Sequence, residues 1–356
     1  MEAPYRLGVL TWRKGNEFEE KRFFTDLAEQ AVQLHTEIFL FSPTDVRADG
    51  RIHALRYRKG EGWRPSIVDP PDLIYDRFRN MQPYAFHPFL KFRKQTKLPF
   101  LNSRLAHKWN LHLLLNSYTE TAKWLPETLY FTGMKEVEQL LKKYQKVYLK
   151  PVNGTGGKGI LTIFLNNKGY LLRGRDATRK YIKKEFTTTA PLQAFLHSWV
   201  KETKYIVQQG LNLNWIEGSV TDFRLLVQKG SDGNWGITGL IGKLGPKRSA
   251  TSNLHGGGKA IDPLQFLQQF LPTEKCNELF AECRKIGLVI AHYLENRFGR
   301  LVELGIDLGI DRKGRIWIIE VNPKPGRELF REIGDLSTYR KAVRSPIEYA
   351  LYLKDH

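Results

Sequence analysis

Cysteine and long apolar runs are both scarce in this chain of 356 residues. The 2 cysteines, Cys276 and Cys283, fall in a segment with a helical pattern, and their spacing excludes both a disulfide framework and a zinc-binding motif. No apolar run approaches the roughly 20 residues that cross a bilayer. The first residues also lack the basic start and long apolar core of a secretory signal. We therefore expect a cytoplasmic protein without a membrane-spanning segment.

Acidic residues are fewer than basic ones, at 37 against 56, which gives a formal net charge of +19. Such a surface attracts anions, among them nucleic acid, nucleotide, acidic peptide and anionic polymers. The basic residues are spread along the chain, as in segments 173–184 and 327–344, and no zinc-finger or RNP signature accompanies them. Specific nucleic-acid binding is therefore not favoured.

Strand and helix patterns alternate along the chain, and internal repeats and low-complexity segments are absent. This alternation predicts an α/β or α+β protein. Expected strands at 5–10, 37–41 and 73–75, with a helix over 17–34, predict a small βαβ-type domain at residues 1–100.

The remaining residues, 101–356, are expected to form a second and larger domain. We divide it into a central subdomain at about 120–210, a C-terminal subdomain at about 211–326 and a helical tail at 327–356. The expected helices cover 103–118, 134–145 and 274–298, and the expected strands cover 127–131, 147–150, 160–165, 205–211, 220–228 and 236–243.

The most informative segment is a predicted hairpin at residues 304–326. Two alternating apolar runs flank the turn sequence at 311–314. If the turn is centred between the last two residues of that tetrapeptide, Asp307 faces Glu320, and Asn322 shares the face of Glu320. Three oxygen donors on one surface suit Mg²⁺. A solvated hairpin whose acids face water fits the same spacing, so this segment alone leaves both interpretations open.

A glycine-rich loop at 154–159 follows a strand-like run that ends near Lys150. Its Gly-x-Gly-x-x-Gly pattern is weak support for a dinucleotide site, because the β-branched residues after it favour a strand instead of a helix. A Walker A loop is excluded because Gly159 follows Lys158. Either backbone N–H groups of a glycine hairpin close over phosphates, with Lys150 reaching them from the preceding strand, or the loop is a surface turn.

A third motif places Asp222 and Arg224 two residues apart on one expected strand, with Lys243 on the next. An arginine in this position could neutralise a phosphate or acyl phosphate, although a structural salt bridge would give the same pattern. The polar loop 251–258 that follows carries His255, which is either a ligand-contacting residue or an ordinary loop histidine.

The order of these motifs, with Lys108 ahead of them, resembles that of the ATP-grasp superfamily. Segments 222–224, 252–258, 305–307 and 320–322 resemble the motifs of RimK-like ligases, and together they span residues 101–326. The whole length, including Tyr75-Asp76-Arg77, is similar to the spore-coat-associated YheC/YheD family of ATP-grasp proteins. The resemblance implies an ATP-grasp fold preceded by the small βαβ-type domain.

The resemblance also implies a carboxylate–amine ligase that forms an acyl phosphate from ATP and releases ADP and phosphate. Nucleotide phosphates would be held by Lys108, Lys150, Gly154, Thr155, Gly156, Gly157, Lys158 and Gly159, and adenine by the hinge residues Gln208, Gln209, Gly210 and Leu211. One or two Mg²⁺ ions would be bound by Asp307, Glu320 and Asn322, and the catalytic residues would be Arg224, Lys243, Asn253 and His255.

Three departures from the RimK-like pattern leave the substrate open. Lys243, Thr251 and Gly256 stand where those sequences usually have arginine. The charge of +19 still favours an acidic or carboxylate-bearing substrate, so the expected product is an acidic protein or peptide extended by an amino acid such as glutamate, or a small peptide-like metabolite. Two other functions remain open: a non-catalytic, nucleotide-binding spore-coat protein, and a phosphotransferase.

Overall fold

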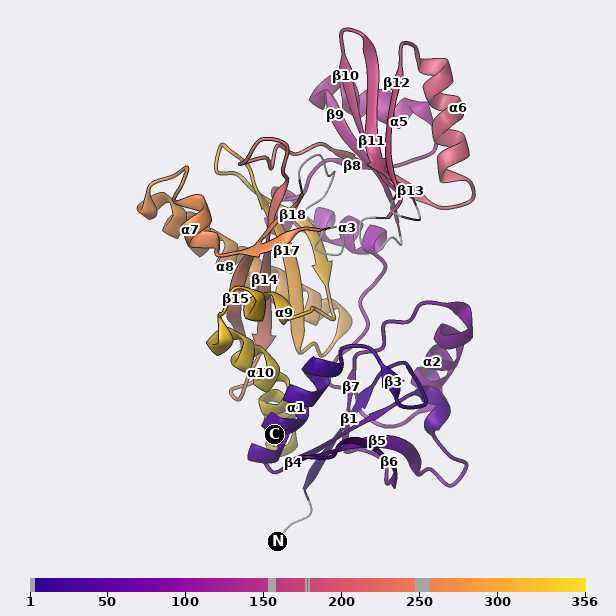
Figure 1. The fold of residues 1–356 in the computed structure, drawn as a ribbon, viewed down its shortest axis with the longest axis vertical. Coiled ribbons are helices and arrows are strands. Elements are labelled where there is room, and N and C mark those ends of the chain that lie inside the picture. Colours follow the sequence, from indigo (N-terminus) through magenta and orange to yellow (C-terminus); the bar gives the residue numbers. More distant parts are fainter. Residues whose placement is uncertain (1–3, 153–157, 177, 179, 247–256) are drawn as a thin grey trace.

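The computed structural model describes residues 4–152, 158–176, 178, 180–246 and 257–356. Three larger β-sheets with flanking helices follow one another along the long axis of the molecule (Figure 1). The first sheet lies at one end, the second sheet at the other end, and the third sheet between them. This mixed architecture confirms the predicted α/β class. Within the described residues, no helix has the length and apolar character needed to cross a membrane.

The first sheet, with strand order β6-β5-β4-β1-β7, opens the chain. Its strands β1 and β4 pair in parallel and α1 connects them, which confirms the βαβ-type opening. The hairpin of β5 and β6 and the helix α2 were not predicted. The elements are β1 (Tyr5–Leu10), α1 (Lys21–Gln33), β4 (Thr36–Phe41), η1 (Pro43–Asp45), β5 (Ile52–Arg58), β6 (Gly62–Val68), β7 (Leu73–Asp76) and α2 (Pro83–Gln95).

The first helix begins later than the predicted residue 17. Strands β2 (Arg13–Lys14) and β3 (Glu17–Phe18) pair in a two-stranded hairpin before it. Gly15 in the turn has a φ of 59°, a conformation that glycine adopts readily. The hairpin thus takes up the residues that the apolar pattern had assigned to the first turn of the helix.

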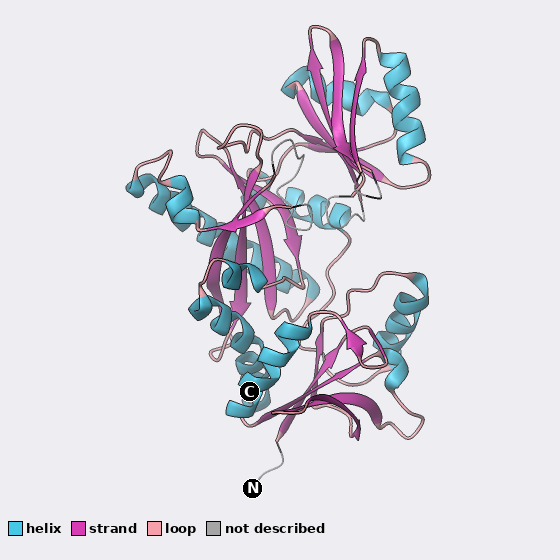
Figure 2. Cartoon of the chain, viewed as in Figure 1, coloured by secondary structure: helices cyan, strands magenta, loops and turns pink. Residues whose placement is uncertain are grey.

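The second sheet is antiparallel, with strand order β12-β11-β10-β9-β13-β8, and its helices α5 and α6 lie on one face (Figure 2). The connection from the first sheet includes α3 (Lys108–Ser117) and α4 (Thr119–Ala122). The elements of the second sheet are β8 (Thr128–Tyr130), α5 (Met134–Tyr144), β9 (Lys146–Pro151), β10 (Ile160–Asn166), β11 (Gly169–Arg175), β12 (Tyr181–Phe186), α6 (Thr189–Val200) and β13 (Tyr205–Gln209).

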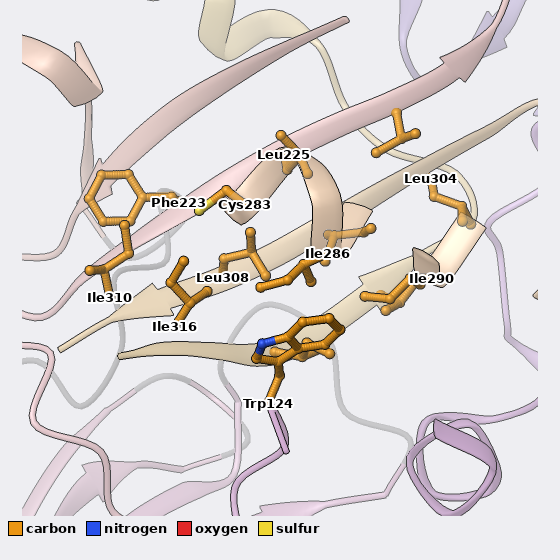
Figure 3. Packing of buried hydrophobic residues seen from close by; sticks show 14 of the residues in the cluster. Trp124, Phe223, Leu225, Cys283, Ile286, Ile290, Leu304, Leu308, Ile310 and Ile316 are labelled. Atoms are coloured by element: carbon orange, nitrogen blue, oxygen red, sulfur yellow. The ribbon is translucent and has the colours of Figure 1, made fainter. Parts of the chain in front are cut away.

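The third sheet, β16-β15-β14-β17-β18, is also antiparallel. Helix α8 packs on one face through residues such as Cys283 and Ile286, which meet Phe223 and Leu308 from the strands (Figure 3). The elements are β14 (Thr221–Lys229), β15 (Trp235–Leu244), β16 (Lys259–Ile261), α7 (Pro263–Leu267), α8 (Thr273–Phe298), β17 (Glu303–Ile310), β18 (Ile316–Asn322), α9 (Glu328–Glu332) and α10 (Leu336–Asp355). Both cysteines lie in α8, in the segment where the sequence predicts a helix, and both are buried free thiols.

Helix α10 joins the first sheet to the third. Its residues Tyr339 and Val343 belong to one buried cluster that contains Leu27 of α1 and Leu226 of β14. Helices α9 and α10 both lie within residues 327–356, where the sequence predicts a helical tail, and α10 packs against both parts of the chain. The proposed domain limits near residues 100, 210 and 326 stay predictions.

The hairpin of β17 and β18 pairs Asp307 with Glu320 and Gly305 with Asn322, as predicted. The route to that register differs from the expectation. The register shifts between Asp307 and Leu308, so the strands nearer the turn pair with an offset of one residue. Without the shift, the pairing near the turn would place Asp307 opposite Ile319. The β-bulge, which the alternation did not reveal, moves the register by one residue and brings Asp307 opposite Glu320.

A buried network of charges connects the first sheet to β17. Arg77, whose side chain is fully buried, donates to Glu303 at 2.7 Å and to Glu20 at 2.6 Å. Arg327 pairs with the other carboxylate oxygen of Glu303. The Nη2 group of Arg77 also donates to the carbonyl of Pro325 at 3.1 Å. Because Pro325 lies three residues after Asn322, the first sheet directly holds the loop that follows β18.

We expect Arg77→Ala to destabilise the protein strongly, because it leaves the buried Glu303 and the partly buried Glu20 with one cation fewer. Breaking a buried pair typically costs about 3–5 kcal/mol. Arg56→Ala is the matched control, since the Arg56–Glu37 pair is largely exposed on the arginine side and such pairs contribute at most about 1 kcal/mol. Denaturant unfolding of both variants measures the difference; equal losses would contradict the assigned role of the network.

Candidate active site

Asp307, on the inner strand β17 of the third sheet, is held by basic side chains from two other strands. Arg224 pairs with Asp307 across β14 and β17, and its Nε and Nη2 groups donate to Oδ1 and Oδ2 at 2.6 and 2.9 Å. The Nζ of Lys243 donates to Asp307 Oδ1 at 2.9 Å and lies 2.7 Å from Oδ1 of Asp222. Two acids and two bases therefore balance in charge within the sheet.

The charges of this group are maintained despite burial. Burial by itself raises the pKa of Asp307, but Arg224 and Lys243 outweigh it and hold that pKa well below its usual range. Burial lowers the pKa of Lys243, whereas Asp222 and Asp307 raise it above its ordinary value. Asp307 and its two basic partners are thus ionised at neutral pH, ready to interact with a charged ligand.

Glu320 and Asn322 lie beside Asp307 on the neighbouring strand. Glu320 pairs with Asp307 in the β17–β18 ladder, and its carboxylate Oε1 lies 2.9 Å from the Nζ of Lys108. Asn322 lies two residues further on, and therefore on the same face of the strand as Glu320. The sequence had assigned Lys108 to phosphates; in this structure its ammonium group pairs with a predicted metal ligand.

The donors present suit Mg²⁺ in chemical kind, because they comprise two carboxylates and one amide oxygen on one surface. In the part of the chain that the structure describes, no three His, Cys, Asp or Glu side chains gather as a metal-binding group. Asp307, Glu320 and Asn322 would therefore supply a partial ligand set, as is usual for Mg²⁺ bound together with water and substrate phosphates.

Lys150 brings the second sheet to this group. Its Nζ donates to Gln208 Oε1 at 2.6 Å, and the amide of Gln208 donates to Thr128 at 3.0 Å. Burial lowers the pKa of Lys150 to about 8; Glu320 opposes that shift and Lys108 adds to it. These interactions place Lys150 and Lys108 close to the same carboxylate, as the order of motifs had suggested.

The predicted hinge begins where β13 ends. The N–H of Gly210 donates to the carbonyl of Lys146 at 2.9 Å, and the Nζ of Lys146 donates to the carbonyl of Leu211 at 2.9 Å. The side chain of Gln209 accepts from the N–H of Glu127 at 3.2 Å. Leu211 belongs to an apolar cluster with Ile319, the residue before Glu320. The hinge therefore lies against the strand that carries the acids.

The glycine loop is described only at its end. Gly154, Thr155, Gly156 and Gly157 lie outside the described residues. Lys158 is exposed, and Gly159 has a φ of 70°, with a carbonyl that accepts from Trp199 at 3.3 Å. The strand β10 that follows pairs antiparallel with β9, which confirms that the loop joins two strands. Asn253 and His255 also lie outside the described residues.

Two residues of α3 near this group, His112 and Trp109, were not predicted. His112 lies one helical turn after Lys108 on α3, and the ring of Trp109 stacks on it with centroids 5.6 Å apart. Burial lowers the pKa of His112 to about 4, with a further contribution from Lys150. His112 is therefore neutral at neutral pH. The four-residue spacing from Lys108 is the signal that could have identified it.

Comparisons with known proteins identify the family of this chain. A family model described as YheC/D-like ATP-grasp matches residues 97–353. The endospore coat-associated protein YheD of Bacillus subtilis (strain 168) is 28% identical over 339 residues, covering 94% of this chain and 74% of YheD. The corresponding protein YheC of the same organism is 28% identical over 318 residues, covering 87% and 86% of the two chains.

Solved structures share the fold at low sequence identity. D-cycloserine synthetase DcsG superposes with a TM-score of 0.57 at 13% identity, covering 95% of this chain and 98% of that one. D-alanine–D-alanine ligase from Bacillus anthracis, complexed with ATP, gives a TM-score of 0.53 at 14% identity, covering 99% and 98%. The fold is thus that of ATP-grasp proteins, and with the family match over most of its length this chain belongs to the YheC/D-like ATP-grasp family.

Proposed function

We propose that this protein is an ATP-dependent carboxylate–amine ligase that works through an acyl phosphate and releases ADP and phosphate. One observation carries the proposal: Lys108 pairs with Glu320 at 2.9 Å, beside the group formed by Asp307 and Arg224. Lys150 is close enough for the charge of Glu320 to act on its pKa. Cations for phosphates, oxygen ligands for Mg²⁺ and cations for a transferring phosphoryl group thus converge in one place.

In the proposed reaction, a carboxylate oxygen of the first substrate attacks the γ-phosphorus of ATP, and the bond from that phosphorus to the bridging oxygen breaks as ADP leaves. The amine of the second substrate then attacks the acyl carbon. Inorganic phosphate departs, and the nitrogen loses a proton as the amide forms. Atoms and charge balance without an oxidant or a reductant.

We assign a role in these steps to the site residues that the structure describes. Lys108 and Lys150 bind the phosphates of ATP, while the hinge at 208–211 holds adenine. Arg224 and Lys243 stabilise the charge on the transferring phosphoryl group, which they do without a change of protonation because both stay cationic.

Mg²⁺ held by Asp307, Glu320 and Asn322 would neutralise phosphate charge when bound. The glycine loop, Asn253 and His255 keep their predicted parts around the phosphates and the reacting groups. These residues and those named above form the proposed active site.

The proposed substrates are an acidic protein or peptide and an amino acid such as glutamate. The net charge of +19 supports an acidic acceptor. The relatives YheC and YheD are named endospore coat-associated, so we also propose an association with the spore coat. A non-catalytic nucleotide-binding coat protein and a phosphotransferase are the competing functions, and product analysis separates all three.

Incubation with Mg²⁺-ATP and pools of amino acids, peptides and acidic proteins should give ADP only when a carboxylate and an amine are both present. Mass spectrometry should show a product heavier by one amino-acid residue. A gain of one phosphate without an amide would identify a phosphotransferase, nucleotide binding without turnover would identify a coat protein, and release of AMP would rule out the acyl phosphate.

Glu320→Gln should lower kcat by at least about 100-fold while the fold stays intact, because the variant loses a charged ligand for the metal at nearly unchanged volume. Glu278→Gln on α8 is the control, since Glu278 is exposed and pairs with the exposed Lys275 at 2.8 Å. Steady-state kinetics with thermal unfolding as a check of folding measures the effect. Full activity of Glu320→Gln would reject the metal assignment.

Binding of a non-hydrolysable ATP analogue should weaken as the pH rises from 7 to 9. The ammonium form of Lys150 binds phosphate, so its contribution is full below its pKa of about 8 and is lost above it. Lys150→Met should weaken binding by about 10- to 100-fold and abolish this pH dependence. Lys142→Met, at an exposed position on α5, should retain both properties. Calorimetric titration decides, and an unchanged pH profile in Lys150→Met would contradict the assignment.

A further inference from the structure

One face of the second sheet carries Lys150, which we assign to ATP phosphates, and this face extends beyond Lys150 to the edge of the sheet. Val147 and Leu149 on β9 belong to the core beneath α5 and α6. Because side chains alternate along a strand, Tyr148 and Lys150 lie on the other face, away from α5 and α6. Trp109 of α3 lies against Tyr130 of β8 on this face, with ring centroids 5.9 Å apart, and Lys108 on the same helix pairs with Glu320, so this face turns toward the third sheet. We call it the cleft face.

A row of residues crosses the cleft face from β9 to the edge of the sheet. Thr162 pairs with Tyr148, Arg173 pairs with Thr162, and Lys183 pairs with Arg173. Arg175 lies two residues along β11, on the same face as Arg173. We call Thr162, Arg173, Arg175 and Lys183 the basic row. It begins beside the proposed nucleotide site and ends at the edge strand β12.

Two polar atoms of the basic row are buried without a hydrogen-bond partner among the described residues. They are Thr162 Oγ1 and Arg173 Nε, and Thr162 is 3% exposed. Buried polar atoms are normally paired. Arg173 also lies directly across from Lys183, a like-charged neighbour that destabilises a sheet. The nearby acid Glu185 already pairs with Lys183 at 2.9 Å. An anionic ligand beside the row would offset the repulsion between Arg173 and Lys183.

Lysines on an exposed edge strand commonly protect a sheet against aggregation. That explanation suffices for Lys183, which is on β12, with a side chain that is 51% exposed. It does not extend to Arg173 and Thr162, which lie on the inner strands β11 and β10. The inner positions therefore point to a ligand.

We propose that the basic row binds an extended, acidic segment of the polypeptide substrate. This inference rests on the proposed function and names both the class of acceptor and the place where it docks. Alternate residues of a strand are about 6.5–7 Å apart, so Arg173 and Arg175 match alternate carboxylates of an extended peptide. The outer edge of β12 offers backbone groups with which such a segment can pair.

The rings on the cleft face argue against a single-stranded nucleic acid as the ligand. Lys146 and Lys150 lie over the ring of Tyr148 at 5.2 and 5.0 Å, and Lys146 and Arg173 lie over that of Phe164 at 5.8 and 5.9 Å. Nucleic-acid sites of this kind stack bases on open aromatic faces. Here the protein's own cations cover those faces, which leaves charge pairing with carboxylates as the recognition chemistry.

The test is fluorescence anisotropy of a labelled ten-residue poly-L-glutamate peptide with the full chain. Lys183→Ala and Arg173→Gln should each weaken binding by about tenfold. Lys184→Ala is the matched control, because Lys184 is the next residue on β12 and lies on the helix side, over the ring of Phe195 at 5.1 Å. Its affinity for the peptide should be unchanged, and all three variants should bind the ATP analogue normally, which confirms their folding.

Equal weakening by Lys183→Ala and Lys184→Ala would overturn the proposal, because attraction would then depend on net charge alone. Tighter binding of a ten-nucleotide oligouridylate than of the peptide would overturn it in favour of nucleic acid. The result is separable from the ligase proposal: peptide binding at this row without any ligation would reject the ligase only, whereas ligation of amino acids without peptide binding would reject the basic row only.

Discussion

The pairing of β14 with β17 is the constraint on which the rest of the site depends. It places Arg224 opposite Asp307, and β15, on the other side of β14, contributes Lys243. Burying an unpaired carboxylate costs several kcal/mol, so the two cations stabilise Asp307 in its ionised form within the sheet. A charged, preorganised carboxylate is what a metal-dependent phosphoryl transfer needs. The same cations would face the transferring phosphate, so one set of ion pairs serves both folding and the proposed chemistry.

Side chains next to the first sheet stabilise the position of β17 and of the loop after β18. Arg77 connects Glu303, four residues before Asp307, to the carbonyl of Pro325, three residues after Asn322. Lys324 in the same loop donates to Asp76 at 2.6 Å. The opening βαβ unit therefore contacts the first residue of β17 and the loop after β18, which lie together at the open end of the hairpin that carries the acids. The Tyr75-Asp76-Arg77 segment, noted only as part of a family resemblance, has its physical role in these contacts.

The features that could be predicted from the sequence are those that depend on residues close together in the chain. Alternation and a turn were enough to pair Asp307 with Glu320, although the bulge beside Asp307 stayed hidden because one extra residue leaves no mark on composition. Strand β12 was missed because its charged residues conceal an edge strand, and α2 was missed because Pro88 interrupts its pattern. The ion pair between Lys108 and Glu320 joins residues far apart in the chain, so only the fold reveals it.

The central claim is that a substrate carboxylate is activated as an acyl phosphate. It is tested most directly by following oxygen from a substrate whose carboxylate is labelled with ¹⁸O. During turnover with Mg²⁺-ATP and an amine, ³¹P NMR of the released inorganic phosphate should show one labelled oxygen for each amide formed, since the carboxylate oxygen leaves with phosphorus. Amide formation with unlabelled phosphate would contradict the account, because the bond between that oxygen and phosphorus would never have formed.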